Sequence, residues 1–557
     1  MRYVSKLFII GAVMLMSPFA LRAQEHKRVE VTKDYTHEAG AATKIVAPTE
    51  ISDAPEYEAE INYNISPETW PIKLEDHNFD PATANFFDFN SAERLYTHFA
   101  VGYPLVSNAV VRYATHYKRL GYFGVGVEHE GDFYKKYNYA LDKKMCIADS
   151  YKMSNRVDVA GGVMVGSQMF EASADYDCSI MNRYAKVTPD RLYFHDANID
   201  LRYGDDFVDL SRLNFGVEVD GGLWSNRVPC DEPFSVLEYN ANANVKLARD
   251  FKGNIIGLDA GFGMWQGNKQ ANYCDMAINM SVSYARTFGI MGVEAGIGYM
   301  YDKVSGRAKP SHFVLPSVRL TFDFGKVGLM PFVELQTNIK HNNLESMYDA
   351  NPFIDYIPMQ GAFATMASTR SYDLHFGIMG TDHASKLAYR VYLGGNFMRD
   401  QMLWYVNEFG TFGFAQDDNN RLFMGAEVEY HPIGGLKLVA NVRAHVDNTK
   451  SLYEVSDARL NAGILANYRL KRWNFNLAGD LVGARHWSIA MATDDAAPQV
   501  FTAPAYFNLK ANVAFKITSA IEVYVDGYNL LNQKEMFHSP YYTDRGLICM
   551  LGVKMDF

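Results

Sequence analysis

Apolar residues occupy every second position over the last eleven residues of this chain. Every odd position is apolar: Leu547, Cys549, Leu551, Val553, Met555 and Phe557. Successive side chains of a β-strand point to opposite faces, so these residues form one apolar face while Lys554 and Asp556 turn the other way. A final strand with one face suited to lipid and one to water, ending on phenylalanine, predicts the closing strand of an outer-membrane β-barrel.

The same alternation recurs along the chain. In 237–247 the residues Glu238, Asn240, Asn242, Asn244 and Lys246 interrupt an apolar set, and 436–446 and 507–517 repeat the pattern with Lys, Asn, Arg and His. A soluble sandwich would bury its apolar faces against each other and join its strands by tight turns at both ends. The recurrent polar partners favour a barrel wall with a wet interior.

Counting from residue 91 gives twenty-three alternating stretches, whereas an antiparallel barrel with both termini on one side needs an even number, so one stretch must be a loop. Assigning 402–416 to a loop places the short turns, such as 249–253 and 431–435, on one side. The long loops, such as 133–152 and 339–368, then fall on the other side. We therefore predict an all-β fold: a transmembrane antiparallel β-barrel of about 22 strands, preceded by an extended segment.

The N-terminus predicts export. Arg2 and Lys6 precede an apolar run from Leu7 to Met16, and Ala23 offers a small residue for cleavage. We divide the chain into a signal peptide (1–23), an extended periplasmic or luminal segment (24–90) and the barrel (91–557). Nothing after residue 23 is an apolar run of about 18 residues, the length of a spanning helix. The expected location is the outer membrane of a Gram-negative bacterium.

Composition agrees with interleaved apolar and polar positions. Hydrophobic residues make up 48% of the chain while the mean hydropathy is only −0.18. The 36 Tyr and 35 Phe would supply aromatic girdles at the two membrane interfaces. A net charge of −11 weighs against nucleic acid as a partner. Five cysteines are too few for a disulfide framework, and a bridge between Cys230 and Cys274, in loops on the same side, is left open.

Enzymatic motifs are absent from the sequence: it has no G-x-S-x-G, H-E-x-x-H, Walker A or dinucleotide fingerprint. Two short stretches combine acids with histidine, 128–130 and 381–383. Successive residues of a strand face opposite ways, so neither stretch brings its ligands together unaided. We expect no catalytic residues, no cofactor and no metal site.

The C-terminal region resembles that of the TonB-dependent receptors. The residues Ile521–Asn532, with an Asn-Leu-Leu-Asn turn, followed by Tyr541–Gly546 and the closing strand, are similar to that family's C-terminal pattern. His341–Tyr348, Asn351–Ile354 and the leader Val29–Tyr35 resemble a subgroup of TonB-dependent-receptor-like barrels. The resemblance implies a barrel of twenty-two strands and a role in transport or reception.

The chain departs from that family before the barrel. The receptors carry a plug domain of well over a hundred residues, whereas 24–90 is too short for one. Because barrels of this width are normally plugged, we expect the lumen to be filled by 24–90, by inward-folded loops such as 339–368, or by another protein. The charged residues expected to line the lumen and to pair with each other or with that filling are Glu238, Lys246, Arg319, Asp323, Glu427, Glu429, Arg443, Asp480, Lys510, Lys516, Glu522 and Asp526.

Two functions remain open from the sequence. The first is a transport or receptor component, in which Val29, Glu30, Val31 and Thr32 would pair with TonB or another partner by strand addition. The second is a scaffold that moves nothing and anchors a periplasmic or surface partner, such as a lipoprotein or repeat protein. Either barrel would contact outer-membrane lipid and the barrel-assembly machinery, the latter through its closing strand.

Overall fold

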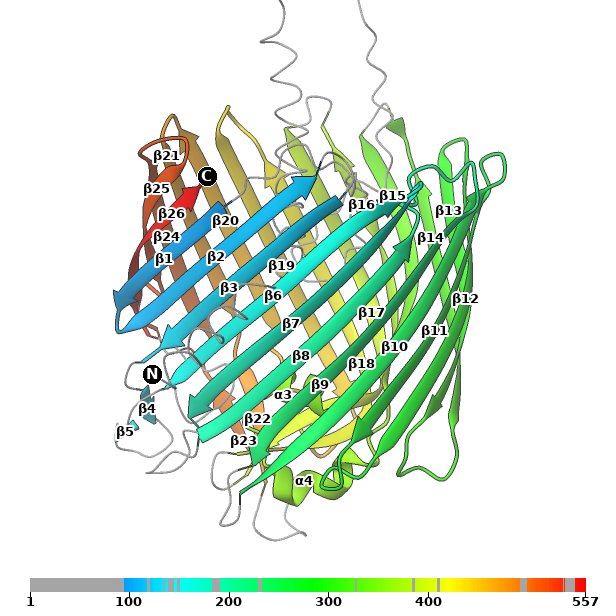
Figure 1. Ribbon diagram of the computed structural model, residues 1–557, viewed down its shortest axis with the longest axis horizontal. Helices are drawn as coiled ribbons and strands as arrows, with labels where there is room; N and C mark the ends of the chain where they lie inside the picture. The colour runs from blue at the N-terminus through cyan, green and yellow to red at the C-terminus, as the bar shows by residue number, and fades with distance from the viewer. Residues whose placement is uncertain are drawn as a thin grey trace, which may run out of the picture.

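The computed structural model (Figure 1) describes residues 95–557 except 118–120, 134–135, 139–144, 148–150, 183–190, 229–232, 326–327, 383–385, 408–410, 491–497, 534 and 536–545. The predicted signal peptide (1–23), the extended segment (24–90) and the proposed partner-binding residues Val29–Thr32 lie outside the described residues. They stay predictions.

Strands dominate the described chain. The first half contains β1 (Leu95–Tyr103), β2 (Val106–Tyr117), β3 (Gly121–Asp132), β4 (Lys136–Asn138), β5 (Met145–Ile147), β6 (Lys152–Val165), β7 (Gln168–Asn182), β8 (Arg191–Gly204), β9 (Asn214–Val228), β10 (Phe234–Asp250), β11 (Ile255–Gly267), β12 (Cys274–Phe288), β13 (Met291–Lys303), β14 (Ser311–Phe322) and β15 (Leu329–Lys340). The second half contains β16 (Thr369–Thr381), β17 (Leu387–Val406), β18 (Phe412–Tyr430), β19 (Leu436–Thr449), β20 (Leu460–Leu470), β21 (Trp473–Val482), β22 (Arg485–Ile489), β23 (Gln499–Ala503), β24 (Tyr506–Lys516), β25 (Ile521–Tyr528) and β26 (Ile548–Asp556).

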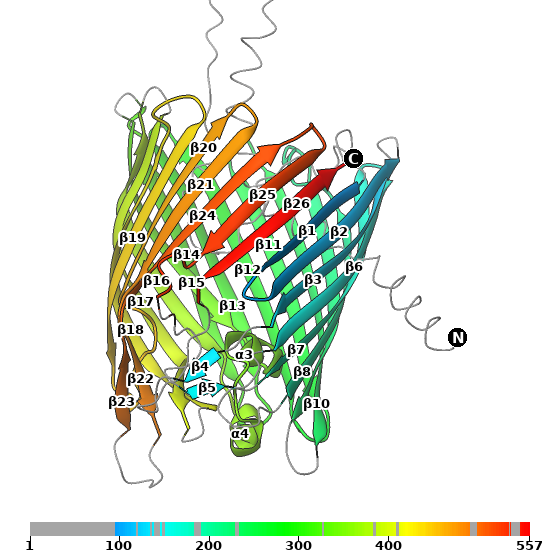
Figure 2. The same ribbon diagram turned by 90° about the vertical axis from the view of Figure 1, so that its left-hand side faces the viewer.

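Twenty-two of these strands form one closed antiparallel barrel (Figures 1 and 2). Each pairs with its neighbour in the sequence, except that β3 pairs with β6 and β21 pairs with β24. The ring closes where β26 pairs with β1, in the register Tyr96 to Asp556. Closure satisfies the backbone hydrogen bonds of both edge strands, as a barrel in lipid requires. The predicted fold class is confirmed.

Four strands lie outside the ring. The β22–β23 hairpin interrupts the connection between β21 and β24, and β22 pairs in parallel with the end of β17 through Tyr405 and Ser488. The strands β4 and β5 form a separate small sheet in the connection after β3. These additions all lie at one end of the barrel, because every one of them belongs to a connection at that end.

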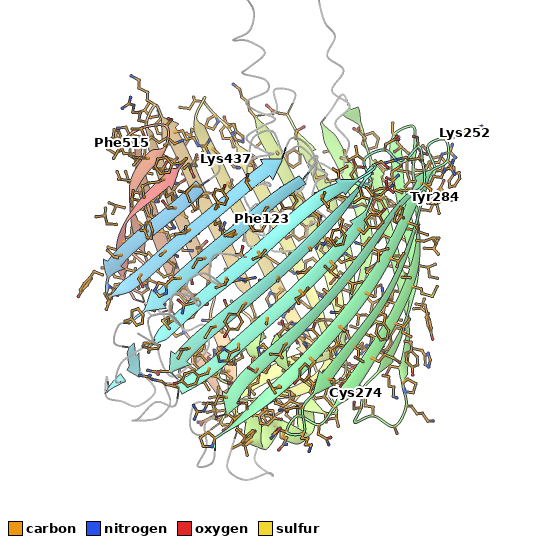
Figure 3. All side chains as sticks on the ribbon, viewed as in Figure 1. Phe123, Lys252, Cys274, Tyr284, Lys437 and Phe515 are labelled. Carbon is orange, nitrogen blue, oxygen red and sulfur yellow. The ribbon has the colours of Figure 1, made fainter. Side chains whose placement is uncertain are left out.

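The two ends of the barrel differ as the sequence predicts. The turn end carries Phe557 and short connections such as 289–290 and 471–472, while the loop end carries the 341–368 connection. Figure 3 shows Lys252 and Lys437 near the turn end and Cys274 near the loop end. The separation is less strict than predicted: a two-residue turn, Pro104 and Leu105, lies at the loop end, and the 205–213 connection lies at the turn end.

As predicted, the stretch 402–416 does not add a twenty-third strand to the wall. Most of its residues nevertheless have strand conformation. It contains the end of β17 and the start of β18, which continue as one hairpin past a register shift between Met398 and Gln401. The turn falls in the middle of the stretch, where the Asn407 amide donates to the Thr411 carbonyl at 2.8 Å. Alternation continues on both sides of this turn, which is why the stretch reads as a single strand.

Two short helices occupy the connection between β15 and β16. They are α3 (Leu344–Ala350) and α4 (Tyr356–Phe363). The Asn343 side chain caps α3 by accepting a hydrogen bond from the Ser346 backbone amide. The Ser346 side chain in turn accepts from the Asn343 backbone amide, which completes a capping box. Within the described residues, no helix is both long and apolar enough to cross a membrane.

The outer face of the wall is apolar along most strands. Met280 and Val282 on β12, Ile297 on β13 and Leu422 on β18 are between 48% and 65% exposed. Phe123 on β3 belongs to the same outer wall (Figure 3). Exposed apolar surface of this extent, running around a closed barrel, matches a lipid-facing band.

Adjacent residues of β12 test which face meets lipid. Val282 points outward and is 48% exposed, whereas Ser283 is the next residue and faces the lumen side of β11 opposite Gly257. We expect Val282→Arg to lower the free energy of folding into bilayers by about 2–4 kcal/mol, the cost of arginine on the lipid face near the midplane. Ser283→Arg, with Asp259 on the same face of β11, should cost far less. Equal losses in urea titrations of liposome-embedded barrels would contradict the assignment.

Candidate functional site

The connection between β15 and β16, residues 341–368, folds against the inner wall; we call it the inward loop. Figures 1 and 2 both place α3 inside the ring of strands near the loop end, with α4 beyond it. The sequence predicts inward folding of this stretch, and the contacts of its side chains with β8–β13 and β17–β18 agree with that prediction. The candidate site is the space that the inward loop and the wall enclose together.

Glu238 of β10 holds the start of the inward loop. Its carboxylate accepts hydrogen bonds from the Asn343 side-chain amide at 2.5 Å, from the Leu344 backbone amide at 2.8 Å and from the Tyr273 hydroxyl. The side chain is completely buried. A buried carboxylate is tolerated because several donors replace its water. As the sequence predicts, Glu238 lies on the inner face, and two of its donors belong to the 339–368 stretch.

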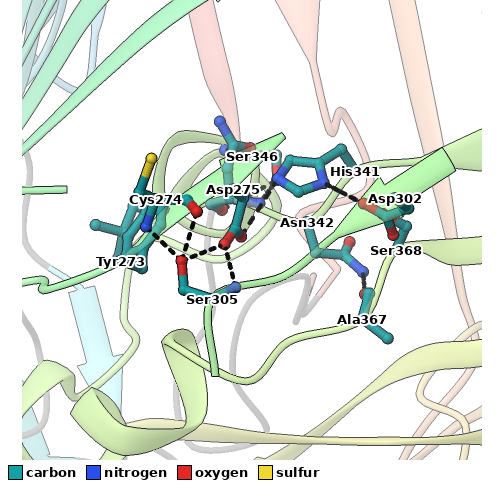
Figure 4. Close-up of polar contacts among 12 residues, drawn as sticks. Tyr273, Cys274, Asp275, Asp302, Ser305, His341, Asn342, Ser346, Ala367 and Ser368 are labelled. Atoms are coloured by element: carbon teal, nitrogen blue, oxygen red, sulfur yellow. Dashed lines mark hydrogen bonds and ion pairs between the residues drawn. The ribbon is translucent and has the colours of Figure 1, made fainter. Parts of the chain in front are cut away.

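A second polar contact lies around His341 (Figure 4). Its Nε2 is 3.6 Å from Asp275 Oδ2, and its Nδ1 is 3.9 Å from Asp302 Oδ1 and 3.2 Å from the Ser368 hydroxyl. The imidazole stacks on Trp265 with 3.9 Å between ring centroids. Burial lowers the pKa of His341 to about 4, so the ring is neutral at neutral pH. These contacts join both ends of the inward loop to β12 and β13.

The two ends of the inward loop are also tied to each other. The Asn342 side-chain amide donates to the Ala367 carbonyl at 2.6 Å (Figure 4) and to the Thr369 hydroxyl at 2.9 Å. Gln416 of β18 accepts from the Ala367 amide and donates to its carbonyl, both at 2.8 Å. The loop therefore leaves and re-enters the wall at nearly one point.

Apolar side chains of the inward loop pack against strands on different sides of the barrel. Leu344, Met347 and Tyr348 of α3 pack with Trp224 of β9 and with Phe414 of β18 in one buried cluster. A second cluster joins strands that are nearly opposite in the ring. It contains Leu192 (β8), Phe353 (inward loop), Val406 (β17), Phe412 (β18) and Trp487 (β22). Backbone bonds reinforce it, because the Phe412 amide donates to the Phe353 carbonyl at 3.0 Å.

Residues 348–352 of the inward loop separate two cavities of opposite charge. The acidic cavity has a volume of about 690 Å³. Its charged lining is Glu130, Asp177, Asp196, Asp200, Asp220, Glu345 and Asp349 against Lys152 and Arg156. Trp224, Trp265 and Tyr348 form its aromatic side. Burial raises the pKa of Asp349, and nearby Lys340 opposes that rise.

The basic cavity lies on the other side of Ala350 and Asn351 and measures about 470 Å³. Its wall comes from β17–β22, with Arg421, Arg443 and Arg485 as its positive charges. Both cavities fall in the size range of sites for small molecules. Oppositely charged cavities beside one loop give the lumen two distinct chemical environments.

Elsewhere the wall charges pair across neighbouring strands, as the sequence predicts. Asp480 meets Lys510 at 2.7 Å, Glu522 meets Lys554 at 3.6 Å, and Arg319 lies 3.5 Å from Glu334. Glu429 contacts both His431 and Lys437. Asp323 departs from the pattern, because it lies beyond β14 and its carboxylate accepts from the Gly325 amide in a turn.

The closing strand has the orientation that its alternation predicts. Leu551 is 63% and Phe557 59% exposed, and Cys549 is also exposed. Leu547 precedes β26, while Val553 and Met555 are half-buried on the same side. The role of this strand in assembly stays a prediction. Cys274 is a free thiol, and Cys230, with which the sequence leaves a bridge open, lies outside the described residues.

Neither acid-and-histidine stretch forms a metal site in the described chain. His129 bonds to Ser107 and Asn155, while Glu128 lies 3.5 Å from Arg112. His383 lies outside the described residues. Among the residues that the structure covers, no group of three His, Cys, Asp or Glu side chains has an arrangement that could hold a metal ion.

Comparison with solved structures identifies the class of fold. The copper transporter OprC superposes with a TM-score of 0.64 at 13% identity, covering 84% of this chain and 81% of its own. The FrpB iron transporter from Neisseria meningitidis gives 0.66 at 10% identity, over 84% and 82%. The siderophore receptor PirA from Acinetobacter baumannii gives 0.65 at 9%, over 84% and 81%. The chain has the barrel fold of the TonB-dependent receptors.

Comparisons at the level of sequence add no relative. No protein-family model matches the chain, and no curated protein matches it. At 9–13% identity the solved structures show the fold alone. The function therefore has to be argued from this chain's own residues.

Proposed function

We propose that this chain is an outer-membrane transport or receptor component of the TonB-dependent-receptor type, whose lumen is occupied by its own inward loop. The apolar outer band and the closed ring support a place in the outer membrane. The fold is shared with proteins described as transporters of copper and iron and as a siderophore receptor.

The inward loop is the observation that carries the proposal. Barrels of twenty-two strands are wide enough to leak unless something occupies them. Here Glu238, His341 and two buried aromatic clusters hold the loop between opposite walls at the loop end. It would restrict passage while leaving two charged cavities beside it, which suits a barrel that binds solutes selectively.

The proposed partners follow from the same fold. Outer-membrane lipid would surround the apolar band, and the barrel-assembly machinery would engage β26 during insertion. Val29–Thr32 would pair with TonB or another periplasmic protein by strand addition. Deleting residues 24–35 should abolish a phenotype that depends on active transport. A phenotype that survives the deletion would exclude a TonB-type role for this segment.

A scaffold without transport is the second candidate. The observation that favours it is the dry packing of the inward loop: Leu344, Ile354 and Phe412 are fully buried, and Phe353 is nearly so. A mobile gate is expected to have few buried apolar contacts, and this loop has many. A permanently occupied barrel could then serve to anchor a lipoprotein or repeat protein.

Purification of the protein from native membranes, followed by conductance measurements, distinguishes both of these functions from that of an open pore. We expect the full chain in a planar bilayer to show negligible conductance, and a periplasmic or surface protein to co-purify with it. Large steady conductance without any partner would overturn the occupied lumen. A co-purifying energy-coupling protein would support the receptor, whereas a stable surface partner and no solute uptake would support the scaffold.

A further inference from the structure

A groove with a volume of about 570 Å³ crosses the outer face of the wall over β10–β14; we call it the outer groove. Its floor is Ala260 of β11, which pairs in register with Val245 of β10 on one side and with Met280 of β12 on the other. A methyl group between longer side chains leaves a hollow in an otherwise continuous apolar surface. Figure 3 labels Cys274 and Tyr284 near the two ends of β12, and the outer groove crosses this strand between them.

The outer groove runs obliquely from the loop end of the barrel toward the turn end. On β14 it begins at Val314, close to the loop end of that strand, and on β10 it reaches Leu247, close to the turn end. Neighbouring strands are about 4.8 Å apart, so a groove across five strands is about 19 Å long. With strands tilted by about 40°, it descends by about 12 Å, which is less than the roughly 15 Å depth of one leaflet of the hydrocarbon core. One acyl chain of a single leaflet therefore matches its length.

Amphipathic aromatic side chains mark the end of the outer groove that is nearer the loops. Tyr299 of β13 lines the groove, and its hydroxyl lies 2.6 Å from Nδ1 of His312 on β14. The His312 ring also contacts Tyr301, with 5.5 Å between ring centroids. Rings of this kind gather where the hydrocarbon core meets the lipid head groups. This end of the outer groove therefore lies at the level of the head groups.

Positive charge surrounds the same end. Lys303 ends β13, and Lys269 and Lys309 lie in the β11–β12 and β13–β14 connections that flank it. All three lysines are exposed, and none forms an ion pair with a described residue. Neither connection contains an acidic residue, while Asp275 and Asp302 of the adjoining strands are buried. Lysines at the head-group level complement the phosphate of an anionic lipid.

The turn end of the outer groove has fewer cations that are free to meet a head group. The guanidinium of Arg249 lies 4.9 Å from the centre of the Phe251 ring. Arg286 donates to the Asn254 side chain at 2.8 Å. Both arginines already contact neighbouring side chains, whereas the lysines at the loop end form no ion pair with a described residue. The distribution of charge therefore favours a lipid of the outer leaflet over one of the inner leaflet.

We propose that the outer groove binds an anionic lipid of the outer leaflet through its phosphate and one acyl chain. Lys303 and Lys309 would contact the phosphate, and the Tyr299 and His312 pair would bond to polar groups of the head. The acyl chain would lie over Ala260 and continue toward β10. Net positive charge at the head-group level selects an anionic lipid over a zwitterionic one. The site requires only a place in the outer membrane, and it goes beyond the transport role proposed above.

Native mass spectrometry of the detergent-solubilised full chain tests the inference. The probes are diphosphoryl lipid A and phosphatidylcholine, each titrated separately. We expect lipid A to bind at one tight site and phosphatidylcholine to leave no retained adduct. A double variant, Lys303→Gln with Lys309→Gln, should weaken the binding of lipid A about tenfold to thirtyfold, because each lysine at a membrane surface contributes roughly fivefold. Ala260→Trp fills the floor of the groove and should weaken binding about tenfold through the lost chain contacts.

Two matched variants serve as controls. Ala174→Trp makes the same change at an exposed position of β7 outside the groove, and Lys252→Gln removes a lysine near the turn end (Figure 3); neither should alter the binding of lipid A. Equal retention of both lipids, or equal effects of the two tryptophans, would overturn the site. Dependence on Lys252 instead of the loop-end lysines would overturn the choice of the outer leaflet. Because lipid binding needs neither a solute nor a periplasmic partner, its failure is distinct from failure of the transport function.

Discussion

Excising the inward loop should convert the barrel into an open pore. Because the Asn342 side chain already donates to the Ala367 carbonyl, a linker of about four Gly and Ser residues in place of 344–365 spans the gap. The strands β15 and β16 would keep their register. We expect single-channel conductance to rise at least about tenfold over the full chain, as for a wide barrel that loses its occupant.

A matched change within the same loop serves as the control. Ile357 of α4 is 51% exposed, so Ile357→Ser leaves both buried clusters intact and should keep the barrel closed. If the excised variant stays as silent as the full chain, the inward loop is not what occupies the lumen. The β17–β18 tip, the β22–β23 hairpin or the residues before the barrel would then be the occupant.

The wall of this barrel could be predicted because it depends on local pattern. Alternation in stretches such as 237–247 and 507–517 places each side chain on the lipid or the lumen face without knowledge of its neighbours. The lengths of the connections then indicate the end of the barrel at which each one lies. Because the number of strands must be even, 402–416 is excluded as a separate wall strand. None of these steps requires a contact between distant residues.

The site could be predicted only in outline, because its contacts join distant residues. The sequence identifies Glu238 as luminal and the 339–368 stretch as a filling, but Glu238 and Asn343 are 105 residues apart. The alternation of 436–446 also marks Arg443 as luminal. Arg485 was missed because it begins β22 rather than ending a wall strand: β21 stops at Val482. A parallel pairing between β22 and β17 has no signature in either segment.

Glu238→Ala should loosen the inward loop more than any other single substitution in the wall. It removes the acceptor for the Asn343 side chain, the Leu344 amide and the Tyr273 hydroxyl at once, in a place without water. Each buried donor left unsatisfied costs about 1–3 kcal/mol. We expect the docked state of the loop to lose roughly 3 kcal/mol, so that α3 amides exchange about a hundredfold faster.

Hydrogen exchange followed by peptide mapping measures this directly, with the amides of β10 and β11 as the internal reference for an intact wall. Glu238→Gln keeps the volume and one acceptor oxygen, so its effect should be smaller than that of alanine. Glu218→Gln removes a luminal carboxylate of β9 that pairs with Arg202 at 2.7 Å and should leave α3 unchanged. Exchange in α3 that is as slow in Glu238→Ala as in the unaltered chain would show that apolar packing alone holds the loop. Faster exchange in β10 as well as α3 would mean that Glu238 supports the wall itself.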